Sequence, residues 1–287
     1  MKKFLRPLFR TVSGAYGAVA RLAWPCFTLP PLRLTLVVTS RCNLSCPYCY
    51  VRGELNQDES NRLSLDEWKR VIDSVPRRML VMLGGGEPFV APDIMGILGH
   101  LFATRHLVAV VTNGTAIDAA RAEFLVDGGL RYLMVSIDGM AEYHDRIRGM
   151  AGAFGRIENL FRTLGELKRR KRRAYPATCV KTTITEDNYD EIPRLLKFAE
   201  NELLADHLSL SFLVQNPLQE GFKLTDDLGD PRFAQGNSYA YPAAVRPRIR
   251  EMLQHVFDWR KTSRLQVEFA PRLGTERRIL EYLEDPA

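Results

Sequence analysis

The residues of this chain best suited to carry chemistry are three cysteines in one short stretch. Residues 41–50 read RCNLSCPYCY, which spaces Cys42, Cys46 and Cys49 as C-x3-C-x2-C. Because the stretch is short, three thiolates can converge on one inorganic centre with little loop-closure cost. An iron–sulfur cube held by three thiolates leaves one iron open to an outside molecule, whereas a closed zinc site needs a fourth ligand. The nearest histidine, His100, is far along the chain, so the spacing favours an iron–sulfur centre over zinc.

Composition places these cysteines in an ordinary globular protein. The chain has 287 residues, of which 46% are hydrophobic and 26% charged, enough for one large domain or two small ones. A net charge of +6 fits an anionic ligand, substrate or surface and does not by itself indicate nucleic acid. The two remaining cysteines, Cys26 and Cys179, are isolated, so we expect no disulfide framework and a reducing, cytoplasmic setting. No apolar run is long enough for a membrane-spanning helix.

The N-terminal residues 1–29 combine cations with apolar side chains. They lack the unbroken apolar segment of a signal peptide, and a basic amphipathic helix of this kind could rest on an anionic membrane surface. The alternative, which we favour, is a helix packed across one end of the domain. The cations are Lys2, Lys3, Arg6, Arg10 and Arg21.

The rest of the chain alternates short branched-residue runs with helical patterns. We expect strands over residues 32–39, 79–83, 107–111, 132–137, 178–184 and 208–214. Expected helices cover residues 65–72, 93–104, 119–126, 154–172, 190–203 and 245–261, the first opened by a Ser64–Glu67 capping box. This order predicts an α/β protein, a partial (β/α)6 TIM-like barrel with an N-terminal helical extension and a C-terminal helical and loop extension.

The predicted domain boundaries follow from that order. Residues 1–30 form the N-terminal extension, residues 31–214 the barrel core, and residues 215–287 a C-terminal lid and helix. Residues 265–269 are compatible with a short extra strand. The basic run 168–173 ends a predicted helix, where a solvated helix terminus is a commoner explanation than an anion-binding patch.

Polar and glycine-bearing motifs follow four of the predicted strands. The cysteine stretch follows the first, residues 84–88 (GGGEP) the second, residues 112–114 (TNG) the third, and residues 136–139 (SIDG) the fourth. In a parallel barrel the carboxyl ends of the strands meet at one rim, which is where active sites form. The four motifs are therefore expected to converge.

These motifs resemble those of the radical S-adenosylmethionine (radical SAM) superfamily over about residues 32–214. The aromatic residue Tyr48 completes a C-x3-C-x-aromatic-C signature, and residues 85–88 resemble the Gly-Gly-Glu-Pro motif of the family. The SIDG segment, followed by residues 144–149 (HDRIRG), is similar to the peptide-modifying (SPASM-type) branch. That branch usually carries further cysteines near its C-terminus, whereas none follows Cys179 here. Either one cluster suffices, or the chain is a fragment.

The resemblance implies a cofactor pair and a reaction. A 4Fe–4S cluster would be held by Cys42, Cys46 and Cys49, and its open iron would be chelated by the amino and carboxylate groups of S-adenosylmethionine. One electron, from a donor such as flavodoxin or ferredoxin, would cleave the cofactor to a 5′-deoxyadenosyl radical. That radical would abstract hydrogen from a peptide or small-molecule substrate. No catalytic side chain beyond the cluster and cofactor is implied, and an alternative is a non-catalytic iron–sulfur scaffold.

The resemblance also implies ligand contacts around S-adenosylmethionine. Gly85, Gly86 and Glu87 would contact the methionine ammonium, which carbonyls and a carboxylate suit. Tyr48 would present an apolar face near the adenine.

Further contacts are expected from the third and fourth strand ends. Ser136 and Asp138 would bond the ribose hydroxyls, and Arg148 would pair with the methionine carboxylate unless it is simply exposed. Asn113 could contact ligand or only form a turn.

Three loop features have a structural interpretation that we favour. His144 and Asp145 are expected to stabilise their loop rather than act as acid–base groups, and residues 187–188 (Asp-Asn) to cap the following helix. Substrate identity is expected to lie in residues 215–244. Four aromatic side chains there could line a pocket or pack the lid onto the barrel, namely Phe222, Phe233, Tyr239 and Tyr241.

Overall fold

A single parallel sheet organises the structure. The computed structural model describes residues 33–49, 51–213, 241–270 and 275–284. Its strands follow one another in the sheet in chain order, and each neighbouring pair is parallel. One more strand than the six expected is present, at the position compatible with an extra strand. The strands are β1 (Arg33–Thr39), β2 (Leu80–Gly85), β3 (Leu107–Thr112), β4 (Tyr132–Ser136), β5 (Ala177–Ile184), β6 (His207–Phe212) and β7 (Gln266–Ala270).

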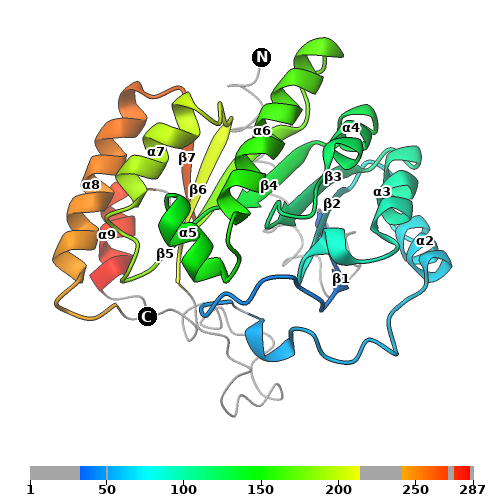
Figure 1. The fold of residues 1–287 in the computed structure, drawn as a ribbon, viewed down its shortest axis with the longest axis horizontal. Helices are drawn as coiled ribbons and strands as arrows, with labels where there is room; N and C mark the ends of the chain where they lie inside the picture. The colour runs from blue at the N-terminus through cyan, green and yellow to red at the C-terminus, as the bar shows by residue number, and fades with distance from the viewer. Residues whose placement is uncertain (1–32, 50, 214–240, 271–274, 285–287) are drawn as a thin grey trace, which may run out of the picture.

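Helices connect consecutive strands, so the predicted partial barrel is confirmed. Figure 1 shows α2 and α3 near β1 and β2, and α8 and α9 beside β7 at the other end of the sheet. The capping box that opens α2 is present, with both Ser64 and Glu67 bonded as expected. The helices are α2 (Leu65–Asp73), α3 (Ile94–Ala103), α4 (Ala119–Asp127), α5 (Ala141–Arg148), α6 (Ala153–Arg170), α7 (Ile192–Asn201), α8 (Arg246–Thr262) and α9 (Glu276–Glu284), with 3-10 turns at Arg52–Glu54 and Pro88–Val90.

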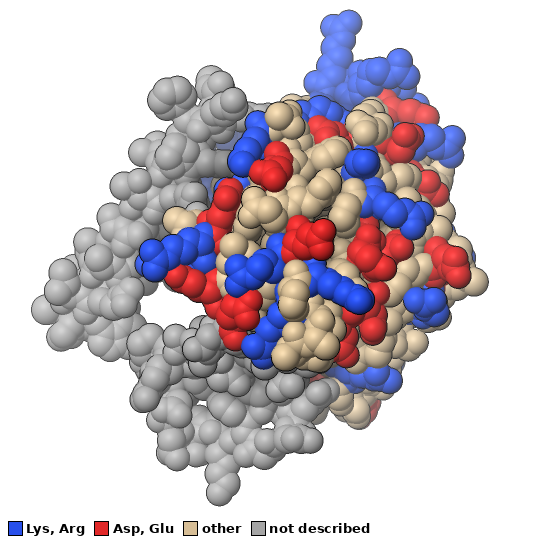
Figure 2. All heavy atoms as spheres, turned by 90° about the vertical axis from the view of Figure 1, so that its left-hand side faces the viewer, with Lys and Arg blue, Asp and Glu red and all other residues tan. Residues whose placement is uncertain are grey.

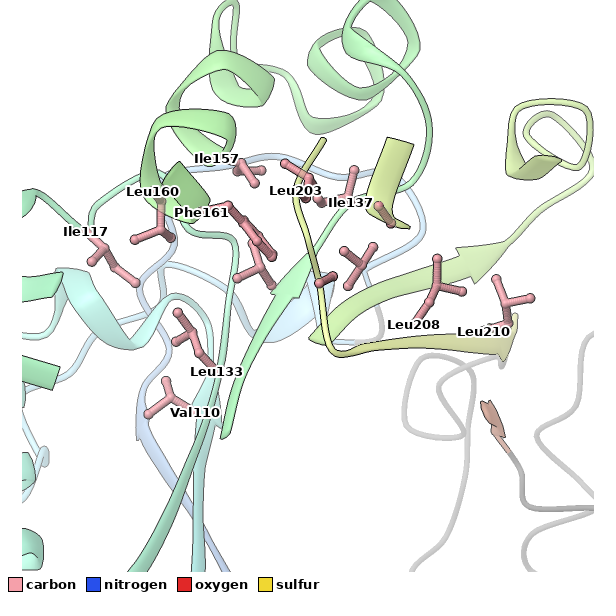
Figure 3. Packing of buried hydrophobic residues seen from close by; sticks show 14 of the residues in the cluster. Val110, Ile117, Leu133, Ile137, Ile157, Leu160, Phe161, Leu203, Leu208 and Leu210 are labelled. Carbon is pink, nitrogen blue, oxygen red and sulfur yellow. The ribbon is translucent and has the colours of Figure 1, made fainter. Parts of the chain in front are cut away.

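The hydrophobic core lies between the sheet and these helices. Successive strand residues point to opposite faces, and the outward set is buried and branched, as with Val110 on β3 and Leu133 on β4. Figure 3 shows Leu160 and Phe161 of α6 packed over these two side chains. Burying each such side chain contributes about 1.5–3 kcal/mol, so the core fixes the strands that carry the motifs.

The opposite, inward face of the sheet is more polar. Ser136 of β4 lies beside Lys181 of β5, and Lys181 beside Ser209 of β6. All three are half-buried, while their neighbours Val135, Val180 and Leu208 are fully buried on the helix side. The concave face therefore offers hydrogen-bonding groups below the motif-bearing strand ends.

The C-terminal part of the chain packs with the core rather than as a separate unit. Strand β7 pairs with β6, and Tyr241 and residues of α8 belong to the same buried cluster as the first six strands. The described residues 241–270 therefore share the core of the first six strands, and the boundary at residue 214 stays a prediction. Tyr241 packs edge-on against Phe212 and donates from Oη to the Ile184 carbonyl at 2.7 Å, which confirms its packing interpretation. The N-terminal extension and Phe222, Phe233 and Tyr239 lie outside the described residues.

Across the described ranges, no helix combines the length and apolar character needed to cross a membrane.

Candidate functional site

The cysteine loop begins at an irregularity in the sheet. The register of β1 against β2 shifts between Val37 and Thr39, which is a bulge of the kind often found beside active sites. Beyond it, Cys46 is buried, and Cys42 and Cys49 are half-buried, all three as free thiols. The Cys49 N–H donates to the Cys46 carbonyl at 3.3 Å, which turns the loop back on itself.

A segment that the sequence did not single out braces the start of this loop. Asn56 accepts from the Cys42 N–H at 3.0 Å through Oδ1. Glu59 accepts from Thr39 Oγ1 at 2.6 Å and from the Ser40 N–H at 2.5 Å, and it forms an ion pair with Arg41 at 3.3 Å. These hydrogen bonds lower the pKa of Glu59 even though its partial burial opposes the shift.

The glycine motif after β2 fits against the cysteine loop through its backbone. The Gly86 N–H donates to the Thr39 carbonyl at 2.9 Å, and the Glu87 N–H donates to the Arg41 carbonyl at 2.8 Å. A Cβ at Gly86 would overlap the Arg41 carbonyl group, so the two segments can approach only because residue 86 has no side chain.

This close approach predicts that alanine is destabilising at Gly86 and tolerated at Gly84. Gly86→Ala is expected to lower the free energy of unfolding by about 1–3 kcal/mol, because the added methyl must push the cysteine loop away, and to reduce the iron bound after anaerobic reconstitution. Gly84→Ala is the matched control, since nothing lies within 4 Å of a Cβ there. Urea unfolding and iron assays measure both effects. Equal behaviour of the two variants would contradict the proposed packing.

Glu87 is an internal tie rather than an exposed ligand group. It is fully buried, and its carboxylate accepts from the Phe89 N–H at 3.0 Å, from Thr112 Oγ1 at 2.7 Å and from the Asn113 N–H at 2.6 Å. Burial raises the pKa of Glu87, while these three donors favour the ionised form. The expected contact of Glu87 with the methionine ammonium stays a prediction, while its carboxylate oxygens bind the end of β3 in the structure.

The turn after β3 holds the cysteine loop from a second side. Asn113 is buried and donates from Nδ2 to Asn43 Oδ1 at 2.8 Å, and Asn43 Nδ2 donates to Thr115 Oγ1 at 2.9 Å. Gly114 has φ +77°, as the expected turn requires. The turn is therefore present, a contact of Asn113 with ligand stays a prediction, and Asn43 is a further loop anchor that the sequence did not indicate.

A buried charge network joins the loop to β4 and α5. Asp138 is fully buried, accepts from Tyr48 Oη at 2.7 Å and from the Thr183 N–H at 3.1 Å, and pairs with the Arg148 guanidinium. Arg148 Nη1 also lies 3.5 Å from Cys46 Sγ, and its Nε is buried without a partner. Tyr48, Asp138 and Arg148 thus form a continuous chain of contacts that ends on a cysteine sulfur.

In this network Asp138 and Arg148 favour their charged forms, and Tyr48 favours its neutral form. Burial alone would raise the pKa of Asp138, but the Arg148 charge and the Tyr48 hydroxyl overcome it, and the pKa is lowered. The pKa of Arg148 is raised by Asp138 despite burial, and burial together with the Asp138 charge raises the pKa of Tyr48. The pair is therefore an ion pair with a neutral tyrosine at its edge. The expected contacts of Asp138 with the ribose and of Arg148 with the methionine carboxylate stay predictions.

The loop-stabilising interpretation of His144 and Asp145 is confirmed. His144 Nδ1 accepts from the Asp138 N–H at 3.3 Å, and burial lowers the pKa of His144 to about 4, so the ring is neutral near pH 7. Asp145 accepts from the N–H groups of Gly152 and Phe154 at 2.6 and 2.8 Å, which caps α6.

The expectation that residues 187–188 cap α7 is wrong. The cap position of that helix is Glu191. Asn188 is instead fully buried, and its Nδ2 donates to the carbonyls of Asp138 and Thr183 at 2.9 and 2.8 Å. It therefore holds the loops after β4 and β5 together.

Lys181 is a cation on the inward face that the sequence did not single out. Its Nζ lies 3.1 Å from Ser211 Oγ, and it forms no ion pair with any described residue. Burial lowers the pKa of Lys181, while the Asp138 charge opposes the shift. Ser136 is its neighbour on β4, so the inward face carries a half-buried cation, not paired with any described acid, that has capacity for an anionic group.

The cysteine loop offers three thiols from one short segment, which suits the three protein ligands of a 4Fe–4S cube. Among the described residues, no three His, Cys, Asp or Glu side chains are arranged to hold a single metal ion. Burial raises the pKa of Cys42 and Cys49, and a bound metal centre deprotonates its coordinating thiols.

Fold and site together define an α/β enzyme core of the partial-barrel type with a three-thiol loop at the carboxyl rim. The Radical SAM superfamily model matches residues 36–199, more than half of the chain. The chain belongs to the radical SAM superfamily, enzymes that use a 4Fe–4S cluster and S-adenosylmethionine. The predicted family and cofactor class are confirmed.

Curated relatives cover two kinds of chemistry. The chain is 34% identical over 191 residues to the AdoMet-dependent heme synthase of Methanosarcina barkeri, which covers 65% of this chain and 52% of that protein. It is 33% identical over 140 residues to the PqqA peptide cyclase of Rhodopseudomonas palustris, covering 48% and 37%. The chain thus spans about half, or less, of the length of the relatives it matches.

Solved structures support the fold. Streptococcus suis SuiB bound to S-adenosylmethionine superposes with a TM-score of 0.64 at 18% identity, covering 91% of this chain and 55% of that one. The enzyme anSMEcpe with bound AdoMet gives a TM-score of 0.59 at 20% identity, covering 82% and 63%.

Proposed function

We propose that this chain is the catalytic core of a radical SAM enzyme that removes a hydrogen atom from a peptide or small-metabolite substrate. When bound, the cluster and S-adenosylmethionine supply a 5′-deoxyadenosyl radical after one-electron reduction. The observation that carries the proposal is the clamping of one loop with three thiols by the ends of β2, β3 and β4. A scaffold protein would have no need for the ends of three strands to hold the cysteine loop so closely.

Cys42, Cys46 and Cys49 hold the cluster in this proposal. The backbone of Gly85 and Gly86 faces the methionine ammonium, because the absence of side chains permits a close approach.

The remaining predicted ligand contacts come from three other strand ends. Tyr48 lies beside the adenine, and Ser136, half-exposed at the end of β4, bonds the ribose. Asn113 contributes by orienting the loop through Asn43.

Glu87, Asp138 and Arg148 act as positioning residues in this scheme. The carboxylate of Glu87 binds the β3 turn, and the Asp138–Arg148 pair fixes Tyr48 and the Cys46 segment. Since Arg148 is already paired, the methionine carboxylate needs another cation. Lys181 fills that role in our proposal, because it is half-buried on the inward face, free of ion pairs among the described residues and adjacent to Ser136.

The assignment of Lys181 predicts a measurable loss of cofactor affinity. A charge-assisted hydrogen bond contributes about 1.5–3 kcal/mol, so Lys181→Met is expected to weaken S-adenosylmethionine binding roughly tenfold to a hundredfold. Lys181→Arg, which keeps the charge, should retain most of the affinity. Equilibrium dialysis on anaerobically reconstituted protein measures the constants, with bound iron as the check that the cluster is unchanged. Equal affinities for the wild-type chain and Lys181→Met would refute this role.

The relatives do not narrow the substrate to a single class. They include a peptide cyclase and heme synthases, and SuiB was solved with its precursor peptide. The proposal therefore includes peptides and small metabolites, together with a low-potential electron donor such as flavodoxin or ferredoxin. Binding of S-adenosylmethionine without its cleavage would favour the alternative of a non-catalytic iron–sulfur module.

A further inference from the structure

Exposed arginines gather at the edge of the sheet opposite the cysteine loop. Because all strands are parallel, the residues that precede them lie at one edge, and backbone bonds join them there, as from Leu107 N to the Met79 carbonyl and from Ala177 N to the Arg131 carbonyl. Figure 2 shows Lys and Arg side chains at the top of the molecule, the side on which α6 ends in Figure 1. The exposed arginines of this edge, here called the arginine rim, are Arg33, Arg77, Arg78, Arg105, Arg169, Arg172 and Arg173.

The positive charges of the arginine rim are not balanced by ion pairs with described residues. None of its guanidinium groups forms an ion pair or hydrogen bond with another described residue. Neighbouring cations at the same edge are paired, as Lys171 is with Glu123 and Asp127. Among the acids near this edge, Asp206 pairs with Lys168 and Asp73 contacts His100, while Glu202 forms no ion pair with a described residue. A net positive surface remains, and the unpaired arginines come from four separate segments of the chain.

Apolar side chains are exposed on the same edge. Leu107 and Tyr132, the first residues of β3 and β4, are 42% and 41% exposed, and Leu204, just before β6, is 63% exposed. The remaining large exposed hydrophobic side chain of the described residues, Val37, lies in the half of β1 nearer the cysteine loop. Apolar groups set among cations are typical of surfaces that rest on anionic lipid. Two of the three exposed apolar side chains here are leucines, which can enter lipid but cannot stack on bases as aromatic side chains do.

We infer that the arginine rim is a docking surface for an anionic membrane. Its guanidinium groups contact lipid phosphates, and Leu107, Tyr132 and Leu204 enter the interfacial layer. The cysteine loop lies at the other end of these strands, which from β1 to β5 are five to eight residues long, so the catalytic rim faces away from the lipid. This inference is independent of the proposed reaction, and it does not involve the N-terminal residues 1–29.

Vesicle binding by the full chain tests the inference. The variant Arg77→Gln/Arg105→Gln/Arg173→Gln removes three rim charges, each worth about 1 kcal/mol near an anionic surface, so its partition onto phosphatidylglycerol-containing vesicles should fall roughly a hundredfold. Binding by the wild-type chain should weaken at high salt, because exposed charges are screened. Leu204→Asn should also weaken binding without loss of stability, since asparagine tolerates the positive φ of this position.

The matched control is Arg156→Gln/Arg162→Gln/Arg277→Gln, which makes the same change in charge on exposed helix faces. It should leave vesicle binding and the melting temperature near those of the wild-type chain. The inference is overturned if the wild-type chain does not bind these vesicles, if it binds pure phosphatidylcholine equally well, or if the two triple variants bind alike. It is also overturned if a short DNA duplex binds more tightly than the vesicles, since the partner would then be a nucleic acid.

Discussion

Cys46→Ala is expected to abolish the formation of 5′-deoxyadenosine. Cys46 is the buried member of the three thiols, and its Sγ lies 3.5 Å from Arg148 Nη1. Two remaining thiolates cannot hold a cube that needs three protein ligands. Bound iron and sulfide should fall with the activity, and anaerobic reconstitution followed by dithionite reduction and chromatographic detection of 5′-deoxyadenosine measures the result.

Cys179→Ala is the control for this loss. Cys179 is also a buried thiol, but it lies on β5 and outside the cysteine loop. Its variant should keep the iron content and the cleavage activity of the wild-type chain. If Cys46→Ala retained a full complement of iron and normal cleavage, or if both variants lost them equally, the assignment of the cluster ligands would be wrong.

Asp138→Asn should destabilise the protein by about 3–5 kcal/mol. The change leaves the Arg148 guanidinium buried without a counter-charge, and breaking one side of a buried ion pair has costs of this size. Asp138 is fully buried and the Arg148 side chain is 12% exposed, so water cannot replace the lost partner. Urea unfolding of the protein without its cluster measures the change in the free energy of unfolding.

Two further variants compare the effect on stability of breaking the buried ion pair with that of breaking an exposed one. The double variant Asp138→Leu/Arg148→Met removes both charges and should recover much of the lost stability. Glu281→Gln breaks the exposed Arg277–Glu281 pair, and its effect should stay within about 0.5 kcal/mol. An Asp138→Asn change as small as that of Glu281→Gln would show that the network does not brace the loop.

Much of the fold is readable from local sequence. Strands such as Leu107–Thr112 carry continuous branched residues, and the capping box at Ser64 marks the start of α2. Helix α5 was missed because Ala141–Arg148 is mostly polar and its end is set by Gly149 in a left-handed conformation. Its stability comes from packing on α6 and from tertiary bonds, which a local pattern does not contain.

The candidate site likewise has some features that the sequence predicts and others that it does not. The three cysteines are predictable because their spacing is itself the signal. The roles of Glu87 and Asp138 are not, since the partners of Glu87 lie 25 and 26 residues away and Tyr48 lies 90 residues from Asp138. Lys181 gave no signal because a single lysine in a strand acquires meaning only when the sheet places it beside Ser136. The internal partners of Glu87 and Asp138 depend on where the fold buries these carboxylates, which residue type alone does not show.

Electron paramagnetic resonance of the reduced cluster tests the central claim most directly. The three-thiol loop is proposed to leave one iron open for S-adenosylmethionine. Adding the cofactor to anaerobically reconstituted, reduced protein should therefore change the cluster spectrum, and the change should be weaker in Lys181→Met at the same cofactor concentration. A fully loaded wild-type cluster whose spectrum does not respond to saturating S-adenosylmethionine would contradict the claim.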